Sequence, residues 1–234
     1  MQVRSTLIMV IILLLIALAW NSVGAGEKEA TKVQDATEVL TEIMAIPEKG
    51  IPPALLHNAY GIAVIPAVLK AGFVVGGRYG WGILAIYPKD GGWSSPTFVS
   101  LTGGSLGYQI GAQSTDIISV FKRGKSIDGI VKGKFTLGAD AAIAAGPVGR
   151  HAEAATDVQL KAEIYSYSRS RGLFAGVALE GAALQIDHKS NVAFYGKKGI
   201  TPGDIFAGKG IAVPAAAEKF EQALTKYTTP AKKD

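Results

Sequence analysis

The sequence predicts an α+β domain in which a strongly coiled antiparallel sheet, or a small β-barrel, is flanked by N-terminal and C-terminal helices. Helical periodicity is confined to the two ends of the chain, and strand-like segments fill the middle. These segments do not alternate with crossover helices, which argues against a doubly wound parallel sheet. Glycines recur at same-face spacing, for example Gly72, Gly76, Gly80 and Gly82. Such a stripe is typical of a sheet that coils strongly or approaches another sheet closely.

Residues 1–25 predict a signal peptide. Arg4 is the only charge before Glu27, residues 7–19 are an unbroken apolar run, and small residues precede Gly26 as a cleavage site requires. The alternative is a retained membrane anchor, although the apolar run is shorter than the roughly 20 residues of a spanning helix. The chain has no cysteine. Export without disulfides favours a periplasmic or otherwise secreted location.

The rest of the chain divides into three parts. Residues 26–60 predict an N-terminal helical segment, because apolar residues such as Leu40 and Ile43 fall at helical spacing with acidic residues between them. Residues 61–213 predict the β-rich core. Residues 214–234 predict a C-terminal helix and a frayed tail.

Within the core, two expectations depend on simple local rules. Residues 61–65 predict a short strand that Pro66 breaks, since proline removes a ladder hydrogen bond. Residues 106–121 predict one long, half-buried strand, since apolar and polar side chains alternate along it. Asp116 interrupts its apolar face and needs a partner if it is buried.

The remaining core segments predict shorter elements. Residues 188–191 predict a hairpin turn leading into a strand at 191–195. The other expected elements are strands over 73–75, 81–87, 93–101, 134–145, 161–170 and 173–187, and short helices over 126–131 and 201–207.

Basic residues of the core are the best candidates for a binding site. The chain carries a formal net charge of +5. Residues 122–134 contain five basic residues and a single acidic one, Asp128. The alternatives are a solvated rim of lysines and a surface for anionic lipid headgroups, where each basic residue contributes about 1 kcal/mol. Arg169 and Arg171 lie two residues apart in a later predicted strand, so their side chains can lie on the same face. The candidate headgroup-binding residues are Lys122, Arg123, Lys125, Lys132, Lys134, Arg169 and Arg171.

Other kinds of site receive little support from the residues. Ser105 lies in a G-x-S-x-G pattern, but a strand-like segment follows where a serine hydrolase needs a helix. The histidines, His57, His151 and His188, are far apart and lack metal-ligand spacing, so no metal is expected. RNA-type stacking motifs are absent, so we expect no nucleic-acid partner.

Several segments, taken together, resemble the SYLF domain family. The fullest is Ser166–Gly181, with its alternating serines and arginines before a glycine-punctuated apolar run. The others follow in the order and spacing of the family: Ile51–Leu56, Gly61–Pro66, Lys70–Phe73, Gly76–Gly77, Trp93 with Pro96, Gly104–Gly111, Phe135–Ala141, Ala145–Pro147 and Tyr195–Gly196. The resemblance spans most of the chain after the signal segment.

The resemblance implies a non-enzymatic module without a cofactor that binds phospholipid, and in fungi also actin. In eukaryotic members it implies acidic lipids or phosphoinositides, reached through an N-terminal amphipathic helix; here that helix has an acidic outer face. We therefore expect an exported, bacterial-type member that binds anionic phospholipid or membrane surfaces in the cell envelope, and we do not expect actin as a partner. The alternative is an envelope domain that is structural or binds other proteins.

Overall fold

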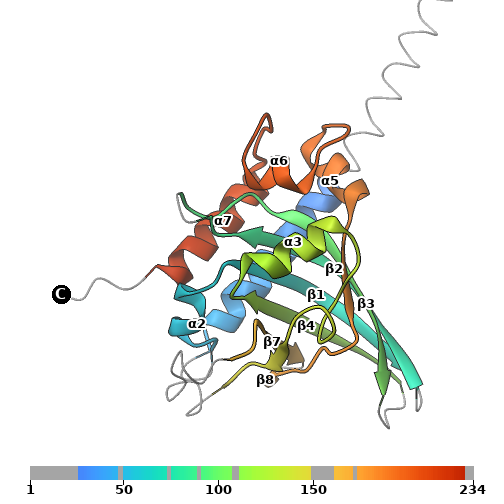
Figure 1. The fold of residues 1–234 in the computed structure, drawn as a ribbon. Coiled ribbons are helices and arrows are strands. Elements are labelled where there is room, and N and C mark those ends of the chain that lie inside the picture. The colour runs from blue at the N-terminus through green and yellow to red at the C-terminus, as the bar shows by residue number, and fades with distance from the viewer. Residues whose placement is uncertain are drawn as a thin grey trace, which may run out of the picture.

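The computed structural model describes residues 26–46, 50–72, 75–88, 91–106, 111–148, 161–170 and 173–229. These residues form an α+β domain in which one strongly curled sheet makes a half-barrel with helices on both sides (Figure 1). The expected signal peptide lies outside the described residues. The strands are β1 (Gly61–Gly72), β2 (Val75–Ile86), β3 (Thr97–Leu106), β4 (Gly111–Phe121), β5 (Phe135–Thr136), β6 (Ile143–Ala145), β7 (Ile164–Ser170), β8 (Leu173–Gly176) and β9 (Ala183–Ile186). The helices are residues 26–44, α2 (Pro53–His57), α3 (Gly124–Lys132), α5 (His188–Tyr195), α6 (Pro202–Phe206) and α7 (Ala215–Thr228).

The sheet is almost entirely antiparallel. Its strand order is β5-β9-β3-β2-β1-β4-β7-β6, and β8 pairs with β7 beside this path. Only β6 and β7 run parallel among the described pairs. Strand β1 pairs with β2 and β2 with β3, whereas β4 pairs with β1, so the consecutive strands β3 and β4 are separated by β2 and β1. The predicted α+β class and coiled sheet are confirmed.

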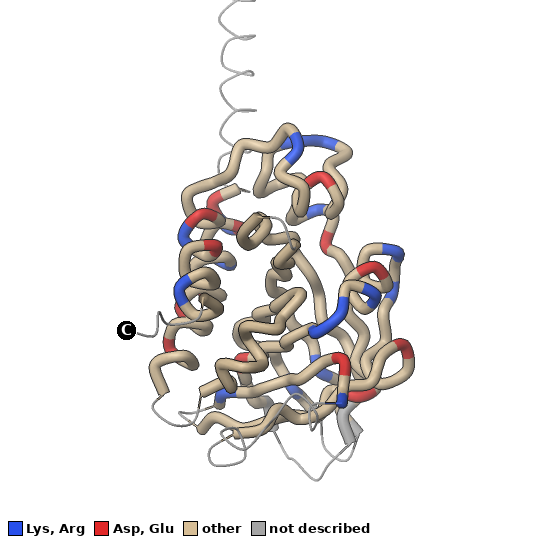
Figure 2. The backbone as a smooth tube through the Cα atoms, turned by 60° about the vertical axis from the view of Figure 1, so that its left-hand side comes forward, with Lys and Arg blue, Asp and Glu red and all other residues tan. Residues whose placement is uncertain are grey.

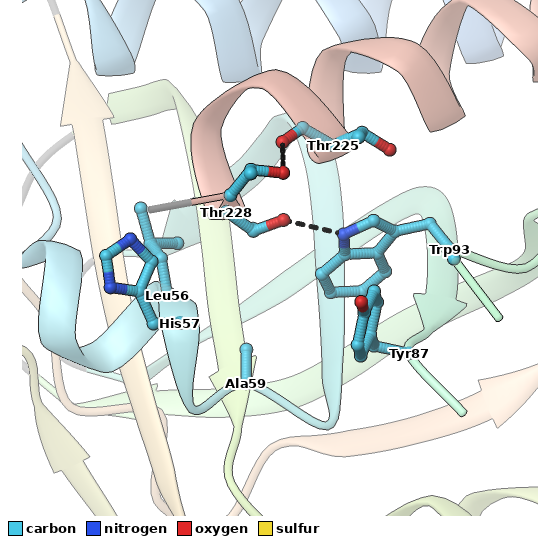
Figure 3. Close-up of a pocket in the computed structure, with 9 residues that line it drawn as sticks. Leu56, His57, Ala59, Tyr87, Trp93, Thr225 and Thr228 are labelled. Carbon is cyan, nitrogen blue, oxygen red and sulfur yellow. Dashed lines mark hydrogen bonds between the residues drawn. The ribbon is translucent and has the colours of Figure 1, made fainter. Parts of the chain in front are cut away.

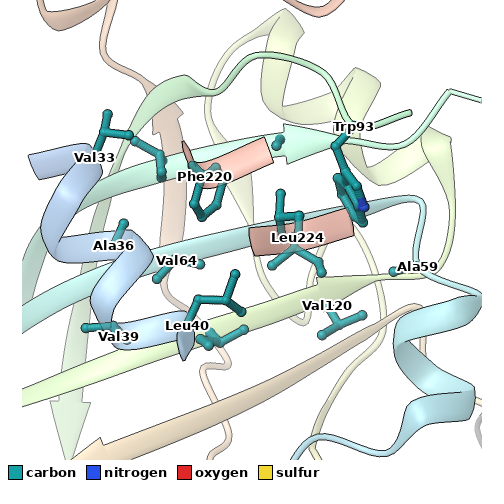
Figure 4. Close-up of a cluster of buried hydrophobic side chains, with 14 of the residues drawn as sticks. Val33, Ala36, Val39, Leu40, Ala59, Val64, Trp93, Val120, Phe220 and Leu224 are labelled. Carbon is teal, nitrogen blue, oxygen red and sulfur yellow. The ribbon is translucent and has the colours of Figure 1, made fainter. Parts of the chain in front are cut away.

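Both faces of the central strands are buried, which gives the domain two hydrophobic cores. On one face, residues 26–44 and α7 cover side chains such as Val64 and Val120, with Leu40 and Phe220 pointing into the same cluster (Figure 4). On the other face, α3 packs Ile127 and Ile130 against the sheet. The strands are therefore apolar on both sides near the helices.

Strand β1 continues through Pro66, which corrects the prediction of a break at this proline. Between Val64 and Leu69 the strand contains one residue more than its partner β2, and the same bulge lies opposite β4. The bulge takes Pro66 out of the regular ladder. Ala67, with φ of 49°, donates its N–H to Asp116 Oδ1 over 3.0 Å, so the side chain of β4 completes the bulge.

Glycines of β2 allow the bulged strand to lie close, as the glycine stripe predicted. A Cβ atom added at Gly82 would lie 2.1 Å from the carbonyl oxygen of Val64 and 2.6 Å from the Cα of Ile65. No side chain other than hydrogen fits there. Gly80 is similarly tight, with a Cβ placed 2.7 Å from the Val68 side chain, so these two glycines of the stripe serve the close packing of β2 on β1.

The long strand predicted over residues 106–121 is two strands. Leu106 ends β3 and Gly111 begins β4, so the expected single strand contains a chain reversal. The period-two pattern did not reveal this reversal because both strands belong to the same sheet. The half-buried interpretation also failed for the second half, where Ile117 and Phe121 on one face and Ile118 and Val120 on the other are all buried.

Residues 188–195 are helical, which corrects the predicted hairpin turn and strand. The side chain of Asp187 accepts the N–H of Ser190 over 3.1 Å and so caps α5. The hydroxyl of Ser190 also lies 2.8 Å from Glu29 of the N-terminal helix. The segments over 134–145 and 173–187 each contain two short strands rather than one. The short helices α3 and α6 and the terminal helix α7 are confirmed.

Within the described ranges, none of the helices has the length and apolar character needed to cross a membrane.

Candidate functional site

Helix α3 carries most of the predicted basic residues. It follows β4 directly, and its buried residues Ile127 and Ile130 fix one face against the sheet, leaving Lys125 and Lys132 exposed. Arg123 precedes the helix in an extended conformation and provides no side-chain cap. The first N–H groups of the helix therefore lack a side-chain acceptor at this position, and such groups favour negative charge.

A pocket of about 230 Å³ lies beside the start of α3. We call it the α3 pocket; it is lined by Lys125, Ser126, Gly129, Lys134, Phe135, Asp140 and Glu163. Among the lining residues Phe135 is buried, and a Cβ added at Gly129 would lie 2.6 Å from the Phe135 ring. The structure thus brings together two lysines that are nine residues apart in the sequence.

The two acids of the α3 pocket are already engaged. Glu163 accepts a hydrogen bond from the Ser126 hydroxyl over 3.1 Å and lies 3.6 Å from the Arg123 guanidinium. Asp140 accepts the N–H of Thr136 over 2.6 Å and so closes a turn. Neither Lys125 nor Lys134 forms an ion pair with a carboxylate in the part of the chain that the structure describes. With Arg123 at its rim, the pocket therefore combines three cations with two carboxylates, a small local excess of positive charge.

Arg169 lies on β7, outside the α3 pocket, and forms ion pairs with two carboxylates. On β7 it faces Asp116 of β4, with Nη2 2.9 Å from Oδ2, and its Nη1 forms an ion pair with Glu42 of the N-terminal helix. Partial burial alone would lower the pKa of Arg169, but hydrogen bonds to Asp116 and Glu42 raise it above its usual value. This arginine joins the sheet to the helix. Arg171, its predicted companion, lies outside the described residues.

Basic residues also occur far from α3, with acidic positions between them (Figure 2). One group lies in the loop after α5, where Lys197 donates to the carbonyl oxygen of Gly210 over 3.2 Å and Lys198 is exposed. Lys189 is exposed on α5 itself. Basic and acidic positions are therefore mixed over the rest of the domain, and among the pockets described only the α3 pocket is lined by two lysines.

A second pocket, of about 210 Å³, was not predicted from the sequence. It lies under the end of α7, where Trp93 donates its Nε1–H to the Thr228 hydroxyl over 2.8 Å and the Tyr87 ring lies against Trp93 (Figure 3). The rest of its lining comes from α2 and the segment after it, including His57 and Ala59. The Trp93 N–H and the hydroxyls of Thr225, Thr228 and Thr229 form hydrogen bonds within the protein. We therefore interpret this pocket as a gap in the packing around Trp93. Its lining joins residues 56–93 to residues 225–229, which are far apart in the sequence, so no local pattern indicates it.

The described residues form neither a serine-hydrolase site nor a metal site. Ser105 lies within β3, opposite Gly76 of β2, and the next described element is the strand β4. A nucleophile elbow needs a helix at that point. In the described ranges, no three histidine, aspartate or glutamate side chains gather as metal ligands. His151 lies outside those ranges.

Comparison with known proteins identifies the family to which this chain is related. A family model described as "Las17-binding protein actin regulator", named Ysc84, matches residues 102–227. The chain is 38% identical over 207 residues to the Protein YSC84 of Saccharomyces cerevisiae, covering 87% of this chain and 43% of that protein. It is 35% identical over 199 residues to an SH3 domain-containing YSC84-like protein 1 of Xenopus laevis, covering 82% of this chain and 59% of that protein.

A third relative, an SH3 domain-containing protein of Schizosaccharomyces pombe, is 40% identical over 177 residues, 74% of this chain and 40% of its own. The chain thus spans about 40 to 60% of the length of these relatives. The description of the family names Las17 and actin, so our expectation that actin is not a partner receives no support. The family match takes in α3 and its pocket, and the relatives cover most of the described fold. The chain belongs to the Ysc84 family, the family of the SYLF domain that its sequence resembles.

Proposed function

We propose that the domain is a non-enzymatic phospholipid-binding module that holds anionic headgroups at the α3 pocket. The observation that carries the proposal is the pairing of Lys125 and Lys134, both without an ion pair among the described residues, beside the uncapped start of α3. A phosphate group at this place would meet two ammonium groups and the positive end of the helix. The acyl chains would stay in the bilayer.

The neighbouring cations extend this surface. Lys132 is exposed on the last turn of α3, and Arg123 is exposed at its start although it also lies near Glu163. Each basic residue close to an anionic bilayer contributes about 1 kcal/mol, and the contribution falls off within a Debye length. Binding through this surface should therefore weaken as salt rises.

The N-terminal helix is a poor membrane anchor in this structure. Its apolar residues, including Val33 and Leu40, are buried in the core (Figure 4), and so is Ile43. Its exposed face carries Glu38, which an anionic surface repels. We therefore place the headgroup contact on α3 rather than on this helix.

The test is co-sedimentation of the protein with vesicles. The proposal predicts pelleting with phosphatidylglycerol-containing vesicles, weak pelleting with phosphatidylcholine alone, and a large loss when Lys125→Glu and Lys134→Glu are combined. The matched control reverses two exposed lysines on and after α5, Lys189→Glu and Lys198→Glu, and changes the net charge equally. Equal pelleting by the two double variants would remove the α3 pocket from the proposal.

A second candidate is protein binding, favoured by the description of the matching family model. Because that model is described as a Las17-binding actin regulator, actin filaments and Las17 are the first partners to test. Sedimentation with actin filaments, in the absence of lipid, separates this candidate from the first. Location bears on the choice as well: we retain export as a proposal, to be tested by sequencing the N-terminus of the protein recovered from cells.

A further inference from the structure

The far ends of β1 and β2 carry an exposed apolar patch. Leu69 is directly opposite Tyr79 across the two strands, and Trp81 lies two residues from Tyr79 on the same face. Their exposed fractions are 55%, 40% and 45%. The rings of Tyr79 and Trp81 meet edge to face with centroids 4.2 Å apart. We call these three residues the hairpin patch.

The hairpin patch continues a core face beyond the helices that cover it. Farther back on the same face, Val64 and Ile83 are completely buried beneath the helical layer. Beyond the β1 bulge, the strands project past the helices (Figure 1). Lys32 of the N-terminal helix marks the boundary, with its Nζ 5.9 Å from the centre of the Trp81 ring. The patch is therefore apolar surface that the fold leaves uncovered.

The charges of this hairpin are all positive. Residues 61–88 contain Lys70 and Arg78 and no acid. The two cations are directly opposite each other across β1 and β2, on the face that lies behind the hairpin patch. Arg78 Nε is buried and has no hydrogen-bond partner among the described residues, and neither cation forms an ion pair with a described carboxylate. Cations without an ion pair among the described residues, on the same two strands as the aromatic rings, suit an anionic partner.

This combination fits the interface of a bilayer better than a protein surface. Tyrosine and tryptophan concentrate at the level of lipid headgroups, because their rings are apolar and their tips polar. Lysine and arginine can extend from the back of such a hairpin to reach phosphates. Three apolar side chains are few against the roughly 20 to 30 residues that a stable protein interface uses on each side.

We propose that the hairpin patch inserts into the headgroup region of an anionic phospholipid bilayer, with Leu69, Tyr79 and Trp81 as apolar anchors and Lys70 and Arg78 as phosphate contacts. This proposal rests on the proposed lipid-binding function and adds a second contact surface on another part of the sheet. Together, the α3 pocket would supply headgroup attraction and the hairpin patch would supply insertion.

Tryptophan fluorescence tests the insertion directly. The full chain has three tryptophans, at 20, 81 and 93. Trp20→Phe with Trp93→Phe leaves Trp81 alone, and a matched protein carries Trp20→Phe, Trp81→Phe, Trp93→Phe and Tyr87→Trp. Tyr87 is 42% exposed, close to the 45% of Trp81, but it lies just past the other end of β2. Each protein is mixed with vesicles of phosphatidylglycerol and phosphatidylcholine whose acyl chains carry bromine, which quenches nearby indoles.

The proposal predicts a blue shift and several-fold stronger quenching for Trp81 than for the tryptophan at position 87. It also predicts that Leu69→Gln lowers the affinity for acidic vesicles about tenfold, as loss of one buried leucine side chain should. The control, Val213→Gln, alters an exposed apolar residue before α7 and should leave the affinity unchanged.

The outcomes separate this proposal from the one on which it rests. Vesicle binding that depends on Lys125 and Lys134 while Trp81 is neither shifted nor quenched would overturn the insertion and leave the α3 pocket standing. If Trp81 inserts equally well when Lys125 and Lys134 are replaced, the result would support the hairpin patch and contradict headgroup binding at the α3 pocket. Absence of vesicle binding would overturn both. A Trp81 shift with actin filaments and none with vesicles would also overturn insertion, because it would assign the patch to a protein.

Discussion

Arg169 and Asp116 face each other across the β4–β7 pair, with the guanidinium Nη2 2.9 Å from the carboxylate Oδ2. The same carboxylate accepts the N–H of Ala67 at the β1 bulge, and the same guanidinium pairs with Glu42. One arginine therefore links strand β7, strand β4 and the N-terminal helix, and Asp116 extends the link to β1. The partner that Asp116 was expected to need is present.

Removing this arginine should cost stability rather than lipid binding. Arg169→Met leaves Asp116 and Glu42 without their charged partner, and we expect the free energy of unfolding to fall by about 1–3 kcal/mol. Arg169→Lys, which keeps the charge but not the two-acid geometry, should recover part of the loss. Urea denaturation measures the stability, and vesicle sedimentation measures binding. Loss of vesicle binding with unchanged stability would show that Arg169 acts as a headgroup contact instead.

Gly82 should tolerate no side chain. The added methyl of Gly82→Ala would overlap the Val64 carbonyl and the Ile65 backbone, which forces β1 and β2 apart. We expect a destabilisation of about 3 kcal/mol or more, or failure to fold. Gly104→Ala is the control, since nothing lies within 4 Å of a Cβ at that strand position. Thermal melts of the two variants should differ widely, and equal melting temperatures would contradict the tight coiling of β2 over β1.

The cap of α5 should be measurable through Asp187. Asp187→Ala removes the acceptor for the Ser190 N–H and should lower the free energy of unfolding by about 1 kcal/mol. Asp187→Asn keeps an acceptor oxygen and should lose much less. Chemical denaturation distinguishes them. If both substitutions cost the same, the charge of Asp187 rather than its cap would be the stabilising feature.

Glu221 should make the domain more stable at mildly acidic than at neutral pH. Burial raises the pKa of Glu221 above its usual value, although a hydrogen bond from Ser95 opposes the shift and Glu218 adds to it. The folded protein then holds this proton at a pH where the unfolded chain has lost it, so stability falls as pH rises through the window between the two pKa values. In Glu221→Gln this contribution is absent. Urea titrations across that window should show a smaller pH dependence for the variant, and identical slopes would contradict the shift.

The fold class followed from the sequence because its signals are local. Helical spacing in residues 26–44 and in α7 needs no knowledge of the sheet, and the glycine stripe reports the coiling of β2. The continuation of β1 through Pro66 did not follow, because the acceptor that supports the bulge is Asp116, 49 residues away. Helix α5 was missed for a similar reason: a run of polar residues favours a turn, and the contact of Ser190 with Glu29 spans 161 residues.

The candidate site was predictable in part. The density of cations in residues 122–134 pointed to α3, and the structure turns two of those lysines toward one pocket. The engagement of Arg169 was not predictable, because its acids come from β4 and from the N-terminal helix. The hairpin patch was also missed, since alternation marks Leu69, Tyr79 and Trp81 as a sheet face without showing where the helical cover ends.

The most direct test of the central claim is a vesicle titration that measures the partition constant of the protein on phosphatidylglycerol-containing membranes. Neutralising the α3 pocket with Lys125→Gln and Lys134→Gln removes about 2 kcal/mol of attraction, so the constant should fall roughly 30-fold. The matched pair Lys189→Gln and Lys198→Gln should change it far less, and added salt should narrow the difference between the two. Equal constants for the two double variants, or binding that ignores the vesicle charge, would contradict the account.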